Sequence, residues 1–172
     1  MLTKELQQKI NEQINLEFVS AYLYLGLAAA CEELNYRGAA RWMRLQAEEE
    51  KGHAMRLFDY LIDRAAKVTL MDVPAPKVEP KSLLEVFQLS LKHEQSVTAS
   101  IDRLYGLAFE QKSFSTAHEL SWFLKEQIEE EKNVRDIVRT IEMLGDDVAA
   151  LLDLDAALGG RTANEVAAPA KE

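Results

Sequence analysis

The chain has 172 residues, 48% of them hydrophobic, which is enough for one domain with a substantial core. Its 7 glycines and 4 prolines are too few for a turn-rich β protein and favour long helices. The net charge of -9 disfavours nucleic acid and anionic membranes as partners and favours cations, although many soluble proteins are equally acidic.

Cysteine usage points to a reducing compartment. The chain has 1 cysteine, Cys31, so it forms no internal disulfide and lacks the metal motifs that need paired cysteines. Residues 1–13 are polar and amphipathic, unlike a secretory signal, and the apolar stretch 21–31 is too short to span a bilayer. We therefore expect a cytoplasmic protein.

Two long segments in the first half of the chain show helical periodicity. The first is predicted from about residue 3 to 34, with Thr3 as its capping residue. The second is predicted from about residue 39 to 66, after a short break at 35–38. Residues 68–82 then carry three of the prolines and cannot be helical.

Two further long helices are predicted in the second half. Ser82 caps the third, with Glu85 three residues later as in a capping box, and this helix continues to about residue 111. The fourth is predicted over about 116–144, and Gly145 is expected to end it.

A short apolar helix is expected over residues 146–158, before a flexible tail over 159–172. The short turns make helices one and two, and helices three and four, antiparallel neighbours. The linker of roughly 15 residues reaches about 50 Å when extended, whereas a 27-residue helix is about 40 Å long. Residues 1–158 are thus predicted to form one all-α domain, a four-helix bundle with a long crossover between helices two and three.

Each predicted helix has a buried seam of residues spaced three and four apart, and each seam is apolar except near its middle. The polar residues there are Glu17, Glu50, His53, Glu94, Gln127 and Glu130. Glu17 and Glu94 each lie 18 residues before the following turn, whereas Glu50 and Gln127 each lie 15 residues after one. We therefore expect all these side chains at one level of the bundle.

Four carboxylates at one depth require compensation. Burying them unpaired costs several kcal/mol per ion, against a typical domain stability of roughly 5–15 kcal/mol. Carboxylates and one imidazole without a thiolate suit iron, manganese or, less selectively, zinc. Glu50 and His53, three residues apart on one helix face, can bind the same ion, and two metals bridged by Glu50 account for the number of carboxylates.

Over essentially its full length the chain resembles the bacterial non-haem ferritins of the ferritin-like di-iron superfamily. The residues that carry the resemblance are Glu17, Tyr24, Glu50, His53, Glu94, Trp122, Gln127 and Glu130, together with the run 126–131. The resemblance implies a ferritin-like bundle with a short fifth helix, and a hollow cage of twenty-four such subunits.

The resemblance also implies a ligand set. Glu17, Glu50 and His53 would bind the first iron, and Glu50, Glu94 and Glu130 the second.

Four other residues have implied roles near this pair of irons. Gln127 would be a hydrogen-bonding or weakly ligating group beside the second iron. Glu49, Glu126 and Glu129 would form a third iron site together with Glu130, the alternative being a solvated acidic face. Tyr24 would hydrogen-bond near the centre and could donate an electron, the alternative being core packing.

The implied function is iron storage by a ferroxidase. Two ferrous ions would be oxidised, with O2 or H2O2 taking one electron from each, and the ferric product would be mineralised inside the cage. No haem is expected, because the segment between Glu50 and His53 has no methionine of the kind that binds haem in bacterioferritin, and Gln127 and Glu130 replace its second Glu-x-x-His.

Other readings remain open at the level of sequence. A rubrerythrin-type peroxidase would need paired cysteines for a second iron site. A di-iron enzyme with an organic substrate would differ from a storage cage in particle size. A bundle that binds nothing would take up no iron.

Overall fold

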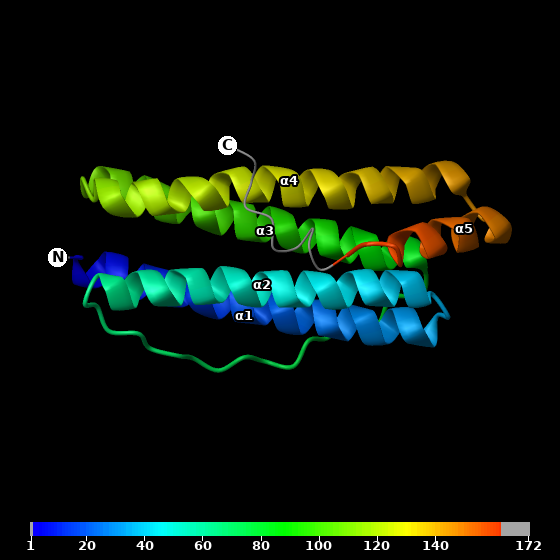
Figure 1. Cartoon of the computed structure of the whole chain (residues 1–172), viewed down its shortest axis with the longest axis horizontal. Coiled ribbons are helices and arrows are strands. Elements are labelled where there is room, and N and C mark those ends of the chain that lie inside the picture. Colours follow the sequence, from blue (N-terminus) through cyan, green and yellow to red (C-terminus); the bar gives the residue numbers. More distant parts are fainter. Residues whose placement is uncertain (1, 163–172) are drawn as a thin grey trace.

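A computed structural model describes residues 2–162 of the chain, and all regular structure in this range is helical. The helices are α1 (Lys4–Glu33), α2 (Arg37–Asp63), α3 (Leu83–Glu110), α4 (Phe114–Leu144) and α5 (Val148–Leu158). The first four lie side by side in one elongated bundle, and α5 lies at the end where α4 finishes (Figure 1). The predicted four-helix bundle with a short fifth helix is therefore confirmed.

The capping residues predicted from sequence act as expected. The Thr3 hydroxyl accepts a hydrogen bond from the Leu6 amide at 3.1 Å, which satisfies one free donor at the start of α1. The Ser82 hydroxyl accepts from the Glu85 amide at 3.2 Å. Gly145 ends α4 with a φ of 59°, a conformation that favours glycine.

A long crossover joins the two helical hairpins. Residues 64–82 run along the outside of α1 and α2 from one end of the bundle to the other (Figure 1). Asn11 of α1 holds the start of this segment, because its side chain accepts from the Thr69 amide at 2.6 Å and donates to the Lys67 carbonyl at 3.0 Å. Further along, a Cβ on Gly26 would lie 2.9 Å from Pro76 Cγ, so glycine lets the crossover pack closely on α1.

The short fifth helix caps the second. Tyr36, the residue before α2, makes no capping hydrogen bond through its side chain. Asp155 of α5 does so instead, since its carboxylate accepts from the amides of Gly38 at 3.0 Å and Ala39 at 2.7 Å. Helix α2 begins at Arg37, two residues before the start predicted at about residue 39.

The core is divided in two. One apolar cluster lies toward the α5 end and includes Leu27, Phe87 and Ile141. The other lies toward the N-terminus of α1 and includes Leu6 and Leu120. The buried polar residues of the seams separate the two clusters, so the bundle has a polar layer between two apolar ones.

By length and composition alone, α1 could cross a membrane, a test that core helices of soluble proteins also pass. Here α1 packs against α2 and α3 and buries Glu17 among them.

The predicted flexible tail falls mostly on residues 163–172, which lie outside the described residues. Its first four residues are described, and Arg161 among them contacts α2.

Candidate metal centre

The six polar seam residues all lie inside the bundle, at the level of the polar layer. Each of the six residues is at most 4% exposed. All four long helices contribute: the residues are Glu17 from α1, Glu50 and His53 from α2, Glu94 from α3, and Gln127 and Glu130 from α4. The structure thus places them where the seam pattern predicted.

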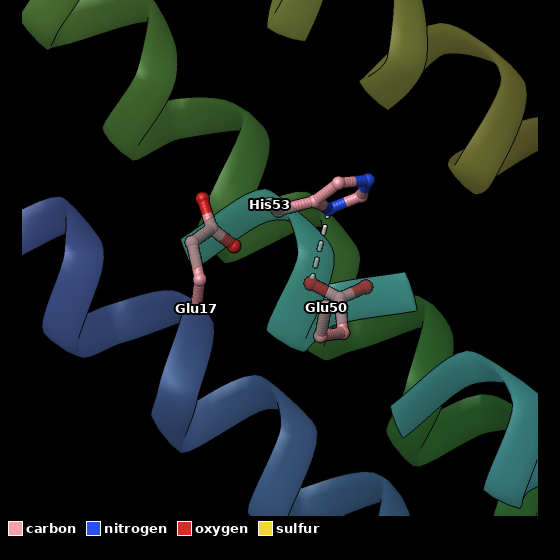
Figure 2. Close-up of side chains that lie close together, drawn as sticks. All are labelled: Glu17, Glu50 and His53. Carbon is pink, nitrogen blue, oxygen red and sulfur yellow. Dashed lines mark ion pairs between the residues drawn. The ribbon is translucent and has the colours of Figure 1, made fainter. Parts of the chain in front are cut away.

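Three of these side chains form a compact group between α1 and α2. Figure 2 shows Glu17, Glu50 and His53 pointing toward one another. One ligand atom from each lies within 4.8 Å of the others, and His53 Nδ1 is 3.4 Å from Glu50 Oε2. This spacing is suitable for three ligands of one metal ion.

A second group lies between α2 and α4. His53, Glu126 and Glu130 also offer ligand atoms that lie within 4.8 Å of one another. Glu94 comes from α3 on the other side of the layer, where its carboxylate accepts a hydrogen bond from the Tyr24 hydroxyl. Tyr24 is fully buried, and this hydrogen bond places it beside the centre, as the family resemblance implied.

The buried glutamates share one bonding pattern. In Glu17, Oε1 accepts from Gln13 Nε2 at 2.7 Å; in Glu50, Oε1 accepts from Gln46 Nε2 at 3.4 Å; in Glu94, Oε1 accepts from Tyr24. The Oε2 atom of each of the three glutamates makes no hydrogen bond, and neither does His53 Nδ1; Glu50 Oε2 and His53 Nδ1 face each other at 3.4 Å. Buried polar atoms without partners are costly, and these four are electron-pair donors. A bound cation would satisfy them all.

Burial strongly favours the protonated form of these carboxyls. It raises the pKa of Glu17, Glu50 and Glu94 to about 8, and the charge of Glu50 adds to the effect on Glu17 and Glu94. The pKa of Glu130 is raised well above its usual range, first by burial and then by Glu50. Without a cation, the four groups would not ionise together near neutral pH.

Sequence reasoning assigned no role to the side chains that hold these carboxylates. Gln13 and Gln46 each lie four residues before the glutamate that they contact, one helical turn away. Ser100 of α3 in turn donates to Gln13 Oε1 at 2.6 Å. The spacing of four between glutamine and glutamate is a signal that could have found both glutamines, whereas Ser100 becomes a neighbour only in the folded bundle.

Gln127 is held from α3. The Thr98 hydroxyl lies 3.0 Å from Gln127 Oε1 and 2.7 Å from Glu131 Oε1, and its single proton can bond either oxygen. The amide oxygen is the ligating atom of a glutamine, and Thr98 can occupy one of its two lone pairs.

The residues expected at a third iron site are differently placed. Glu126 is half-buried, Glu129 is exposed, and Glu49 forms an ion pair with Arg161 at 2.7 Å. Burial raises the pKa of Glu126, and the charges of Glu49 and Glu129 contribute to the shift. The three carboxylates therefore lie close enough to affect one another's pKa. Within the described residues, neither group of ligand atoms that lie within 4.8 Å of one another includes Glu49 or Glu129.

Aromatic rings close the centre on the α4 side. The rings of Trp122 and Phe123 lie edge-on to the imidazole of His53, at centroid distances of 5.4 Å and 5.9 Å. The Arg56 guanidinium covers Trp122 at 4.1 Å. These rings pack against His53 and contribute to its burial.

Comparison with known proteins gives the same picture. Residues 7–144 match the Ferritin family, described as a ferritin-like domain. A bacterial non-heme ferritin of Staphylococcus aureus is 38% identical over 165 residues, which cover 96% of this chain and 99% of that protein. A bacterial non-heme ferritin of Staphylococcus haemolyticus is 36% identical over the same shares.

Solved structures extend the likeness to three dimensions. An open pore ferritin from the hyperthermophilic archaeon Archaeoglobus fulgidus has a TM-score of 0.93 and 38% identity, over 94% of this chain and 100% of that one. A humanized archaeal ferritin has a TM-score of 0.92. With a family match over most of its length and relatives of this identity, the chain belongs to the ferritin family, among the bacterial non-haem ferritins.

Proposed function

We propose that this protein stores iron and is a ferroxidase, which oxidises Fe(II) with O2 or H2O2 as the electron acceptor. The ferric product is mineralised inside a hollow cage of twenty-four subunits in the cytoplasm. The observation that carries the proposal is the set of buried glutamates with one oxygen hydrogen-bonded and the other not, beside His53 Nδ1, which faces Glu50 Oε2 at 3.4 Å. The names of the S. aureus and A. fulgidus relatives support it.

The first Fe(II) substrate ion binds to Glu17, Glu50 and His53. Their ligand atoms already lie within 4.8 Å of one another, so little rearrangement is needed. Gln13 fixes the orientation of Glu17 through the oxygen that does not bind metal. Held ligands of this kind lose less conformational entropy on binding.

The second Fe(II) binds to Glu50, Glu94 and Glu130, with Glu50 as the bridge. Gln127 stands where a further carboxylate would strengthen this site, and its amide oxygen is shared with Thr98. An amide carries no charge, so we expect the second iron to be held more weakly than the first and to pass on to storage more readily.

Oxidation removes one electron from each iron. O2 takes up these two electrons and two protons to give H2O2, or H2O2 takes them up with two protons to give two waters. Hard carboxylate ligands favour Fe(III) over Fe(II), which promotes the reaction. Tyr24, hydrogen-bonded to Glu94, is placed to supply a further electron or to steady that ligand.

Two further expectations concern other metal groups. Glu49, Glu126 and Glu129, with Glu130, are proposed as a third iron site beside the pair. Haem is not expected as a cofactor, because Lys51 and Gly52 stand between Glu50 and His53, where bacterioferritin has its methionine.

The test adds Fe(II) aerobically to apo-protein and follows ferric absorbance in the near ultraviolet, then locates the iron on a sizing column. We expect fast oxidation and co-elution of iron with protein in the wild type. Glu50→Gln should slow the oxidation by at least tenfold, because both irons lose the bridging carboxylate. Glu33→Gln, at an exposed site at the end of α1, is the matched control and should keep the wild-type rate.

Two results would contradict the proposal. One is a wild-type protein that takes up no iron. The other is Glu50→Gln oxidising Fe(II) as fast as Glu33→Gln, since the oxidation would then occur elsewhere.

A further inference from the structure

A cationic side chain from the segment after α5 lies beside the proposed iron sites. Arg161 Nη2 donates to Glu49 Oε2 at 2.7 Å, and Nη1 donates to Gln46 Oε1 at 2.8 Å. The guanidinium carbon lies 4.9 Å from the centroid of the Trp42 ring. The Arg161 side chain is 16% exposed and that of Glu49 is 9% exposed, so three contacts hold this ion pair largely out of water.

The same contacts connect Arg161 to the proposed iron pair. Because Gln46 accepts from Arg161 through Oε1, its Nε2 is left to donate to Glu130 Oε2 at 2.7 Å and to Glu50 Oε1 at 3.4 Å. A single glutamine therefore joins Arg161 to two glutamates that are expected to bind iron. Figure 1 shows the described part of the chain turning back along the bundle after α5.

We propose that Arg161 is the resident counter-cation of the third iron site: its guanidinium occupies Glu49, and a metal ion binds Glu49 together with Glu126 and Glu129 only by displacing it. The inference rests on the proposed function, since it assigns a control residue to one of its iron sites. Arg161 holds Glu49 through Oε2, and repulsion between the guanidinium and a metal ion at the same carboxylate disfavours their binding together.

The exchange has a direct consequence for the order of binding. The third site fills after the pair and with lower affinity, because an incoming ion must first break two charge-assisted hydrogen bonds. Displacing Arg161 also frees Gln46 Oε1, which loosens the orientation of the amide that holds Glu130. Arg161 is thus a positioning residue that acts on iron through Glu49 and Gln46.

Binding of Zn2+ to assembled apo-protein tests the inference without any redox step. Zn2+ takes carboxylate and imidazole ligands and does not change oxidation state. Calorimetric titration should give tight binding at the pair and a weaker class at the third site in the wild type. In Arg161→Gln the weaker class should tighten by roughly ten- to a hundredfold, which corresponds to the loss of a competing charged hydrogen bond.

A double-mutant cycle shows whether the effect passes through Glu49. In the Glu49→Gln background, Arg161→Gln should leave Zn2+ affinity unchanged, whereas a general structural effect of Arg161 would persist. Arg161→Lys keeps the charge but cannot make both hydrogen bonds, so it should tighten the third site only severalfold. This variant gives the same comparison if Arg161→Gln fails to assemble.

The outcomes separate the two proposals. Tight binding at the pair with an unchanged third class in both Arg161 variants overturns the role of Arg161 and leaves the proposed ferroxidase centre intact. A wild-type protein without tight Zn2+ binding at the pair overturns the proposed function and this inference with it.

Discussion

At the residue scale, the centre is built from carboxylates that are each fixed at one oxygen. Gln13 holds Glu17, Gln46 holds Glu50, and Tyr24 holds Glu94. The second oxygen of each of these glutamates is buried and makes no hydrogen bond, and that of Glu50 faces His53 Nδ1 at 3.4 Å. Such an arrangement lowers the folding stability of the metal-free protein and favours a bound cation. The affinity of the site for cations therefore comes at the cost of the stability of the metal-free fold.

The stability of the apo-protein should therefore fall as pH rises from about 6.5 to about 8.5. Burial raises the pKa of Glu17, Glu50 and Glu94 from 4.5 to about 8, so the folded state binds more protons than the unfolded state in this window. Stability decreases with pH wherever the folded state binds more protons. We expect a loss on the order of a few kcal/mol, measured as a falling thermal midpoint of metal-free protein.

His93 contributes little to the change in stability between pH 6.5 and pH 8.5. Burial lowers its pKa from 6.5 to about 4, so its own contribution changes mainly between these two values and with the opposite sign. Glu17→Gln, which remains neutral, is the control and should be more stable than wild type at pH 8.5 with a flatter profile. An apo-protein equally stable at pH 6.5 and 8.5 would contradict this account.

At the element scale, the docking of α5 depends on a close approach to the start of α2. A Cβ on Gly38 would lie 1.7 Å from the Asp155 carbonyl oxygen, so a larger residue must push α5 away. The carboxylate of the same aspartate caps α2. The absence of a side chain at Gly38 therefore lets the C-terminal part of α5 pack against the start of α2 and cap it.

Gly38→Ala should destabilise the subunit by roughly 1–3 kcal/mol, because relieving the overlap breaks the cap. Gly106→Ala is the matched control: it lies inside α3 with no atom within 4 Å of the new Cβ. That change should stabilise by about 0.5–1 kcal/mol, the ordinary gain of alanine over glycine in a helix. Denaturant unfolding of both variants measures the difference, and equal shifts of the same sign would contradict the role of Gly38.

At the scale of the whole molecule, α5 leaves apolar surface uncovered. Leu158, at 8% exposed, is the only buried residue of α5, and Leu151 and Leu154 are partly covered by the core. Leu152 is 52% exposed on the same short helix. An apolar surface of this kind is typical of a contact between subunits, as expected for a cage.

Particle size tests the cage directly. Twenty-four subunits of 19.4 kDa give a particle of roughly half a megadalton, whereas a di-iron enzyme with an organic substrate would be far smaller. Leu152→Glu should shift the sizing profile to smaller species without loss of helical content, because a charge would be buried at the contact. Leu152→Met is the conservative control, and an unchanged profile in Leu152→Glu would exclude α5 from the assembly contact.

The sequence by itself determined the architecture and the level of the centre. Helix lengths, caps at Thr3 and Ser82, and the long proline-containing linker fixed the bundle and its crossover, because these depend on local spacing and backbone chemistry. The inward glutamates and His53 were predictable for the same reason: a polar residue on an apolar seam is visible in one dimension.

Only the tertiary structure decided which groups hold those ligands and which compete for them. Ser100 on Gln13, Asp155 on the start of α2, and Arg161 on Glu49 join residues 87, more than 100 and 112 positions apart in the chain. A hydrogen bond acts over about 3 Å, and no local pattern records which distant donor folding brings within that distance.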